Sequence, residues 1–539
     1  MDATVTPVPS AAERVPAEIW LQIFALVPKS TDLYSLSVAS RRFRDLTTRA
    51  LHRDLVWIKP HSAEQDLVVW EREDGMDPHV RSLEISIPSK RVHNMPRADD
   101  RLSDDTPAEA NARLAYIAAM QKLDAILWVH IRKFTNLSSL AFIDMHIDNE
   151  HFHLIHRLPQ LRSLRLEACV FSGNASQGFD NRTLPITELT MLNVRRGQDS
   201  RPNWHQPLNW AHFQQLMQLH ANGPPPMPGG GGPPAWMHPA DPFAEALSLA
   251  VAANLRTLTI DESADVFRYV FEPMDAEARG WTVPASIEEL YVKRTRALSA
   301  ETKPAAHGQG SFPDTHLYHF CTQAPSLKLV STPIFVPAQV TIAPEALPLG
   351  LDRFAAPLET AQFVAAVRDV KALGLLKCGL ATREGVTALA DIALARPGLK
   401  MLMMECQHWD AEIVSAVSLH FKELRRLKIM YVGAGPDENF LVSLAPDFLA
   451  EMPDLHTLEM YRLPPRSDFV PAHPQFLCDE SWGSIEEEMR DLLIGWNRFC
   501  PKLRKVQLVS GYAMTRGFEG GVWKLERISH LEQIEYLDY

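Results

Sequence analysis

A short phrase of apolar and polar positions, apolar-x-x-apolar-x-apolar, recurs along most of this chain after residue 80. Its last three positions alternate as in a β-strand that buries one face, so each copy predicts a short strand. The clear copies begin at Leu161, Ile186, Leu255, Ile287, Leu399, Leu424, Leu455 and Leu503, and weaker copies lie at Leu83, Leu140, Leu327 and Leu373.

Prolines and helix-start signals sit between these phrases. Proline ends a helix and favours extended backbone before the strand. Five copies have a proline two residues ahead of the first apolar position, namely Pro159, Pro325, Pro397, Pro453 and Pro501. Helix-start signals precede three strands, at Thr106–Glu109, Asp241–Pro242 and Ser484–Glu487. A unit of helix, proline and strand resembles a leucine-rich repeat, whose copies stack because none can bury its apolar face alone. We therefore predict an irregular α/β solenoid over residues 80–539.

The first sixty residues follow a different, helical pattern. One stripe of a helix that starts at Pro16 and stops before Pro28 carries Ile19, Trp20, Ile23, Phe24 and Val27. Ser30 or Thr31 can cap a second helix, and Ser40 can open a third that runs through Leu46 to Leu55. Three helices make a small core, so part of the apolar stripe is expected to pack on something else. The pattern leaves open whether that is a partner protein or the rest of the chain.

The stretch from Val15 to Arg44 closely resembles the F-box, in the form common in fungal F-box proteins. It reads V-P-x-E-I-W-x-x-I-F-x-x-V-P-x-x-x-D-L-x-x-L-S-x-A-S-R-x-F-R. The resemblance implies docking on a Skp-type adaptor that links the chain to a cullin ubiquitin ligase. The positions that match the docking residues of the family are Val15, Pro16, Ile19, Ile23, Leu33 and Leu36. Val15 replaces the usual Leu, and Ala39 stands where Val or Cys is common.

These patterns predict four segments. Residues 1–13 form a Pro/Ala-rich disordered tail, residues 14–58 the three-helix segment, residues 59–79 a linker and residues 80–539 the repeat domain. The Gly/Pro-rich stretch Gly223–Pro234 is expected to be a mobile insertion that folding does not need; a ligand for a proline-recognition module is the alternative. A second polar loop is expected at Arg294–Phe312.

Composition narrows the class of protein. Hydrophobic residues make up 46% and charged residues 22%, as in ordinary globular proteins. A net charge of −12 argues against a broad nucleic-acid surface. The sequence shows no signal peptide and no apolar run of roughly 20 residues, so we expect no membrane span. Six cysteines without a CxxC pair indicate a reducing compartment, the cytosol or nucleus.

Candidate chemistry is sparse. The motifs GxSxG, P-loop and HExxH are missing from the sequence, so we expect neither an enzyme nor a cofactor. The densest set of metal-ligand side chains is Asp144, His146, Asp148, His151, His153 and His156. His153 and His156 could bind zinc from one helix face, but a histidine-rich surface helix explains them as well. The arginines between Arg41 and Arg53 are either a solvated face or a contact for an acidic adaptor.

The function predicted from these features is substrate recognition in a Skp–cullin–F-box ubiquitin ligase. A scaffold that binds the adaptor outside a ligase is the alternative. The residue between the last two apolar positions of each phrase points away from the core. This row reads Arg165, Thr190, Thr259, Tyr291, Met403, Lys428, Glu459 and Gln507. Its mixed charge predicts recognition of a client protein without an obligatory phosphate; a merely solvated row, with clients bound at loops or at the C-terminal end, is the other interpretation.

Overall fold

The fold is given by a computed structural model in which two compact units are distinguished, residues 1–255 (unit 1) and residues 256–539 (unit 2). It describes residues 14–25, 27, 30–57, 77–86, 128–172, 178–196, 249–261, 283–293, 320–321, 323–333, 347–378, 382–463, 477, 481 and 483–528. The predicted tail 1–13, most of the linker 59–79, the helix starts at Thr106 and Asp241, the Gly223–Pro234 stretch and the Arg294–Phe312 loop lie outside these residues.

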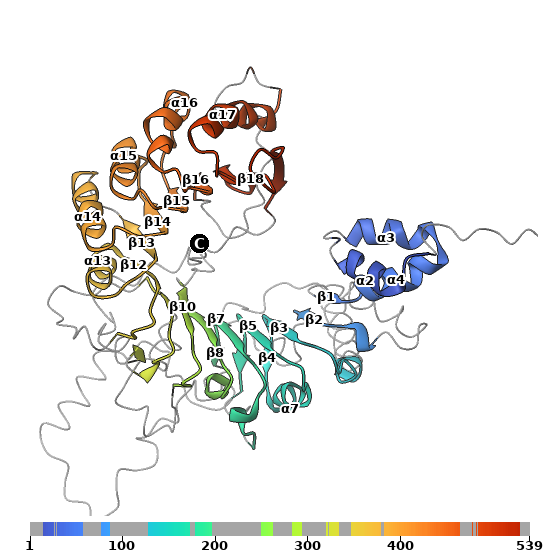
Figure 1. Ribbon diagram of the computed structural model, residues 1–539. Helices are drawn as coiled ribbons and strands as arrows, with labels where there is room; N and C mark the ends of the chain where they lie inside the picture. Colours follow the sequence, from blue (N-terminus) through green and yellow to red (C-terminus); the bar gives the residue numbers. More distant parts are fainter. Residues whose placement is uncertain are drawn as a thin grey trace, which may run out of the picture. The chain divides into compact units, whose positions relative to one another are not determined.

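Unit 1 opens on the predicted helices α2 (Ala17–Ala25), α3 (Ser30–Ala39) and α4 (Arg41–Leu51) (Figure 1). Ser40 caps α4, since its hydroxyl accepts a hydrogen bond of 3.0 Å from the backbone N–H of Phe43. The expectation that Leu55 extends this helix is wrong, because α4 ends at Leu51 and Leu55 belongs to strand β1 (Asp54–Trp57). Burial alternates along β1, with Leu55 and Trp57 inside, and this period of two replaces the helical period.

The strands of unit 1 stack in parallel and in register. The order is β1, β2 (Ser82–Ile85), β3 (Ser139–Ile143), β5 (Ser163–Glu167) and β7 (Glu188–Leu192), with α7 (Asn149–Arg157) between β3 and β5. Leu83, Leu140, Leu164 and Leu189, the central apolar positions of four copies of the phrase, face one another along this sheet. The register is the one predicted for stacked repeats.

A tight turn follows three consecutive strands of unit 1. Asp144, Ala168 and Asn193 occupy it with φ of 52°, 54° and 50°, a left-handed conformation that Asp and Asn tolerate better than Ala. The Asp144 N–H donates to the Glu167 carbonyl and the Ala168 N–H to the Leu192 carbonyl, each over 2.8 Å. After each turn comes a two-residue strand, and these strands, β4 (His146–Ile147), β6 (Val170–Phe171) and β8 (Arg195–Arg196), form a second parallel sheet. Backbone hydrogen bonds in two parallel sheets thus join neighbouring repeats.

Unit 2 continues the repeat with strands on one side and helices on the other (Figure 1). Its parallel strands are β9 (Thr257–Asp261), β10 (Glu289–Lys293), β11 (Leu329–Ser331), β12 (Arg353–Pro357), β13 (Ala372–Cys378), β14 (Met401–Cys406), β15 (Arg426–Tyr431), β16 (Thr457–Arg462) and β17 (Lys505–Val509), and the antiparallel β18 (Tyr512–Thr515) and β19 (Lys524–Arg527) follow. The helices of this unit include α13 (Leu358–Val367), α14 (Thr382–Ala395), α15 (Ala411–His420), α16 (Glu438–Asp447), the 3-10 helix η5 (Leu449–Glu451) and α17 (Ile485–Phe499). Every copy of the phrase that falls in unit 2 forms a strand, and β12, which the sequence analysis missed, adds one more.

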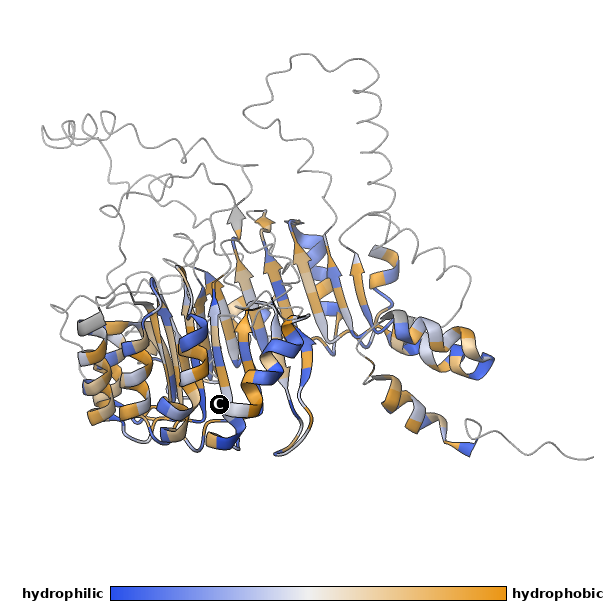
Figure 2. Cartoon of the chain, turned by 90° about the horizontal axis from the view of Figure 1, so that it is seen from above, coloured by the Kyte–Doolittle hydropathy of each residue, from blue (hydrophilic) through white to orange (hydrophobic). Residues whose placement is uncertain are grey.

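Prolines and capping residues explain where these helices begin and end. α14 ends before Pro397 and α17 ends before Pro501, as expected for prolines ahead of a strand. The Ser484 hydroxyl accepts the Glu487 N–H at the start of α17, and Asp410 and Asp437 cap α15 and α16 in the same way. Apolar residues recur along the strands in Figure 2, and the leucines of the phrase are almost fully buried. Among the described residues, no helix is both long enough and apolar enough to cross a bilayer.

Gly374 on β13 lies where the backbone of the sheet is crowded by its neighbours. A Cβ added there would come within 2.6 Å of the Ala355 Cβ and 2.7 Å of the Met403 Cε. We therefore expect Gly374→Ala to lower the free energy of unfolding by about 1–3 kcal/mol, the usual cost of overpacking a core. Denaturant unfolding of the whole chain measures it. Gly385→Ala in α14 is the control, because no atom lies within 4 Å of its added Cβ; a helical glycine replaced by alanine gains about 0.5–1 kcal/mol. Equal effects of the two substitutions would contradict the packing argument.

Candidate protein-interaction surfaces

The three-helix segment of unit 1 (residues 14–51) is held by a small aromatic core. The ring of Trp20 lies 5.6 Å from that of Phe24 and 4.8 Å from that of Phe43, measured between centroids. Leu33 and Leu46 complete this core, with 6% and 8% exposure. Partly buried apolar side chains pack against this core, namely Ala17, Trp20, Leu21, Val27, Leu36, Phe43, Ala50 and Leu51.

Part of the predicted docking set stays on the surface of this segment. Ile19 and Ile23 are 45% and 41% exposed, and Pro16 is exposed as well. Val15 and Leu36 are half-buried, and the Val15 carbonyl accepts a 2.7 Å hydrogen bond from Arg42 of α4. Leu33 belongs to the core instead, where its role is to hold α3 against α2 and α4. The exposed isoleucines lie four residues apart on α2 and share one face.

The predicted client row exists as a line of register partners in each unit. In unit 1 the line joins Glu84, Ala141, Arg165 and Thr190. In unit 2 it joins Thr259, Tyr291, Ser331, Ala355, Gly374, Met403, Lys428, Glu459 and Gln507. The predicted row lacked Glu84 and Ala141 in unit 1 and Ser331, Ala355 and Gly374 in unit 2. The last three lie four residues after Leu327, Leu351 and Val370, which begin the phrases that carry them.

The two lines differ sharply in exposure. The Arg165 side chain of unit 1 is 44% exposed, contacts Glu167 and lies 4.0 Å from a carboxylate oxygen of Glu84. In unit 2, by contrast, Met403 and Lys428 have 0% exposure and Glu459 has 1%. The expectation that Tyr291, Met403, Lys428, Glu459 and Gln507 face solvent is therefore wrong, because each is buried at 3% exposure or less. We call the sheet face that carries this line, away from α13–α17, the inner face of unit 2.

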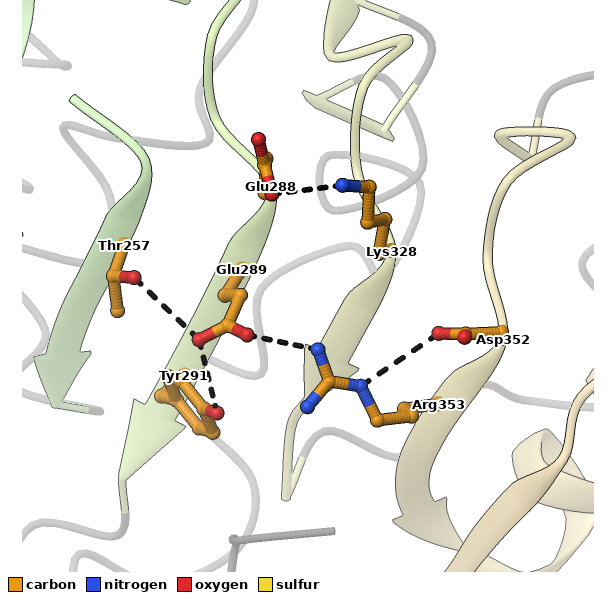
Figure 3. Close-up of polar contacts among 7 residues, drawn as sticks. All are labelled: Thr257, Glu288, Glu289, Tyr291, Lys328, Asp352 and Arg353. Carbon is orange, nitrogen blue, oxygen red and sulfur yellow. Dashed lines mark hydrogen bonds and ion pairs between the residues drawn. The ribbon is translucent and has the colours of Figure 1, made fainter. Parts of the chain in front are cut away.

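Polar residues at the start of the inner face are joined by hydrogen bonds (Figure 3). Glu289 on β10 accepts from Arg353 on β12 over 2.8 Å, from the Tyr291 hydroxyl over 3.3 Å and from Thr257 on β9 over 3.4 Å. Burial alone would lower the pKa of Arg353, but the Glu289 carboxylate next to it raises the pKa above the usual value. The network thus fixes a charged pair across three strands.

A second charged cluster lies at the other end of the inner face. Glu459 on β16 pairs with Arg426 on β15 over 2.8 Å and with Lys505 on β17 over 2.9 Å. Lys428 is the register partner of Glu459, and its ammonium lies 5.9 Å from the centre of the Tyr461 ring. The apolar side chains that pack together here are Tyr291, Leu329, Ala355, Ala372, Leu376, Met401, Met403, Met430 and Tyr461.

The histidine-rich helix is used for structure. Asp148 caps α7, and its carboxylate lies 2.8 Å from Nδ1 of His151. Burial alone would raise the pKa of Asp148, but the hydrogen bond to His151 lowers it to about 2. His156 bonds Asn181 over 2.8 Å, and His153 packs edge-on against Phe179. Within the described part of the chain, no group of three or more His, Cys, Asp or Glu side chains is arranged to hold a metal ion.

The described cysteines fill apolar space. Cys169, Cys321, Cys406 and Cys500 are free thiols and all are buried. Burial raises the pKa of Cys169 to about 12, and its Sγ lies 3.2 Å from the Phe142 carbonyl, to which the thiol donates. A protonated, buried thiol is unreactive, so these side chains act as small core residues.

Comparisons with known proteins do not assign this chain to a family. No family model matches the chain, and no curated protein matches its sequence. Among solved structures, an internalin (inlF) from Listeria monocytogenes is similar, with 13% identity, a TM-score of 0.25 and coverage of 62% of this chain and 77% of the internalin. The plant peptide hormone receptor RGFR1, solved in complex with RGF2, has 11% identity and a TM-score of 0.18, with 62% of this chain and 48% of the receptor covered. The class is defined by the parallel, in-register strands and the helices between them: an α/β solenoid with leucine-rich-repeat-like units.

Proposed function

We propose that this chain is the substrate-recognition subunit of a Skp–cullin–F-box ubiquitin ligase. The three-helix segment would bind the Skp-type adaptor, and the solenoid would hold a client protein. Such a subunit needs no active site, because holding the client beside the transferring enzyme raises its effective concentration.

The observation that carries this proposal is the apolar surface on α2. Ile19 and Ile23 are exposed on one helix face although the same helix already supplies Trp20 and Phe24 to its own core. An exposed apolar patch beside a small core is typical of a protein-binding site. Pro16 and Ile23 occupy positions that match the docking residues of the F-box, which favours a Skp-type adaptor as the partner.

The predicted row runs through both units, but only part of it is accessible to a client protein. Unit 1 offers an accessible polar line around Arg165, with Glu84 and Glu167 beside it. The matching line of unit 2 is buried in the isolated chain. The client surface we propose is therefore the accessible line in unit 1.

Co-purification separates the ligase subunit from the alternative, a scaffold that binds the adaptor alone. The tagged full-length chain, expressed in cells treated with a proteasome inhibitor, is expected to recover both a Skp-type adaptor and a cullin. Mass spectrometry of the eluate measures this. Recovery of the adaptor without a cullin would favour the scaffold, and recovery of neither would refute both.

A further inference from the structure

A cavity of about 540 Å³ opens in unit 1 where α3, α4 and β1 meet. Tyr34 and Val38 of α3 and Val56 of β1 form its apolar wall, and their side chains are 66%, 63% and 52% exposed. The lining does not include Ile19 or Ile23 of α2, so the cavity is distinct from the proposed adaptor surface. A hollow with several exposed apolar side chains is typical of a binding site.

The cavity continues onto the accessible sheet face of unit 1. Asp54 and Val56 line the cavity, and on β1 they alternate with the buried Leu55. Val56 is also the register partner of Glu84, which begins the accessible line that leads to Arg165. We call the sheet face that carries this line the inner face of unit 1. A ligand in the cavity can therefore extend directly over that face.

The inner face of unit 1 is acidic. Its inward-facing positions on β1, β2, β5 and β7 carry the carboxylates of Asp54, Glu84, Glu167 and Glu188, and Arg165 is the cation among the described positions of this face. Arg165 is already paired with Glu167 and lies 4.0 Å from a Glu84 oxygen. Phosphate recognition uses clustered arginines, so this face is complementary to a cationic segment instead.

Short hydroxyl side chains lie between the carboxylates. Ser82, Ser139 and Ser163 are register partners in a row that begins at Asp54 and ends at Glu188. The three serines are half-buried, and their small size lets the backbone of a bound peptide come close to the sheet. Their hydroxyls can donate and accept hydrogen bonds with that backbone. The row thus forms a floor on which an extended peptide can lie.

We propose that unit 1 binds a client segment in which one large apolar residue is joined to several Lys or Arg residues. The apolar side chain fills the cavity, and the cationic side chains lie over the inner face of unit 1. Arg44 of α4 lines the cavity and opposes the reverse placement, because a lysine there would meet its guanidinium. That the segment belongs to a client rests on the proposed function, whereas binding of such a peptide does not.

The spacing of the strands fixes the length of a suitable probe. Four strand spacings separate β1 from β7, which amounts to about 19 Å. In an extended peptide Phe-Ser-Lys-Ser-Lys-Ser-Lys, the lysines lie on the same side as the Phe, at roughly 7, 14 and 20 Å from it. This peptide with a fluorescent label is the probe. The reversed sequence is measured as well, because either chain direction satisfies these spacings.

Fluorescence anisotropy with the full-length chain tests both halves of the site. One of the two peptides is expected to bind, and replacing its Phe by Ser or its Lys by Glu should weaken binding roughly tenfold or more. Glu188→Lys on the inner face and Val38→Asp in the cavity should each cause a similar loss. Glu150→Lys on α7 and Val129→Asp, at a valine with 54% exposure, are the matched controls and should bind normally. All four positions are exposed, and thermal melting of each variant verifies the fold.

Arg165→Gln separates a site for cations from a site for phosphate. Arg165 competes with the lysines of the peptide for Glu84 and Glu167, so its removal should tighten binding of the lysine peptide. Loss of affinity in this variant would overturn the proposal, as would binding of neither peptide or unchanged affinity in Glu188→Lys or Val38→Asp. The measurement contains no adaptor, so a negative result leaves the adaptor assignment untouched, and failure of adaptor binding leaves this result untouched.

Discussion

Ile23→Asp is expected to abolish stable binding of the adaptor while leaving the chain folded. Ile23 is 41% exposed, so the substitution removes little packing from the core of Phe24, Leu33 and Leu46. In the complex the same side chain would be buried, where an apolar residue contributes about 1.5–3 kcal/mol. Its loss alone weakens binding roughly tenfold to a hundredfold, and an unpaired charge in the dry centre of the interface adds to this. A pull-down with a purified Skp-type adaptor, followed by titration, measures the change.

Ile494→Asp is the matched control for this substitution. Ile494 lies on α17 in unit 2 with 55% exposure, so it receives the same change in a similar helical environment. Adaptor binding should be unchanged in this variant, and both variants should melt within a few degrees of the parent chain. An Ile23→Asp variant that binds the adaptor with full affinity would remove the main support for the proposed function.

The solenoid could be predicted because short stretches of sequence determine its strands and its helix ends. Each phrase places an apolar residue every second position, and each strand then pairs with its neighbour at the equivalent residue, as Leu402 does with Leu427. Prolines such as Pro397 and Pro501 stop the preceding helix by removing an N–H, which requires no tertiary contact. For the same reason the caps at Ser40 and Ser484 were correctly located.

The features that were missed depend on neighbours far away in the sequence. β12 has Phe354 and Ala356 where the phrase usually has large aliphatic residues, and it becomes a strand because β11 and β13 lie on either side of it. The two-residue strands β4, β6 and β8 are too short to carry a period of their own. In both cases pairing with other strands, and not local propensity, decides the structure.

Burial was the least predictable property of the candidate site. Alternation correctly places Lys428 and Glu459 on the face opposite the leucines, but it cannot tell whether that face meets water. A buried lysine is costly unless other groups compensate its charge, so a sequence reader expects Lys428 to be solvated. Likewise Leu33 matches a docking position of the F-box, yet packing against Phe24 places it in the core. The packing of the three helices against one another decides which apolar residues of this segment remain exposed.

Glu459→Ala is expected to be the most destabilising single substitution in unit 2. The Glu459 side chain is 1% exposed, and its two oxygens pair separately with Arg426, itself only 8% exposed, and with Lys505. Removing this carboxylate leaves two cations beside Lys428 without their shared counter-charge. Breaking a buried ion pair on one side costs about 3–5 kcal/mol, which exceeds the gain of a more apolar side chain. Chemical denaturation should show this loss, and Glu459→Gln, which keeps the hydrogen-bond acceptor, should lose less than Glu459→Ala.

An ion pair at the protein surface, between Asp454 and Lys502, is the control for this test. Asp454 lies 2.5 Å from Lys502, with side chains 46% and 58% exposed, and this hydrogen bond lowers the pKa of Asp454 below its usual value. Because water screens the pair, Asp454→Ala should change the free energy of unfolding by no more than about 1 kcal/mol. If Glu459→Ala proved as mild as Asp454→Ala, the inner face of unit 2 would have to be open to water. That outcome would also contradict the burial of Lys428.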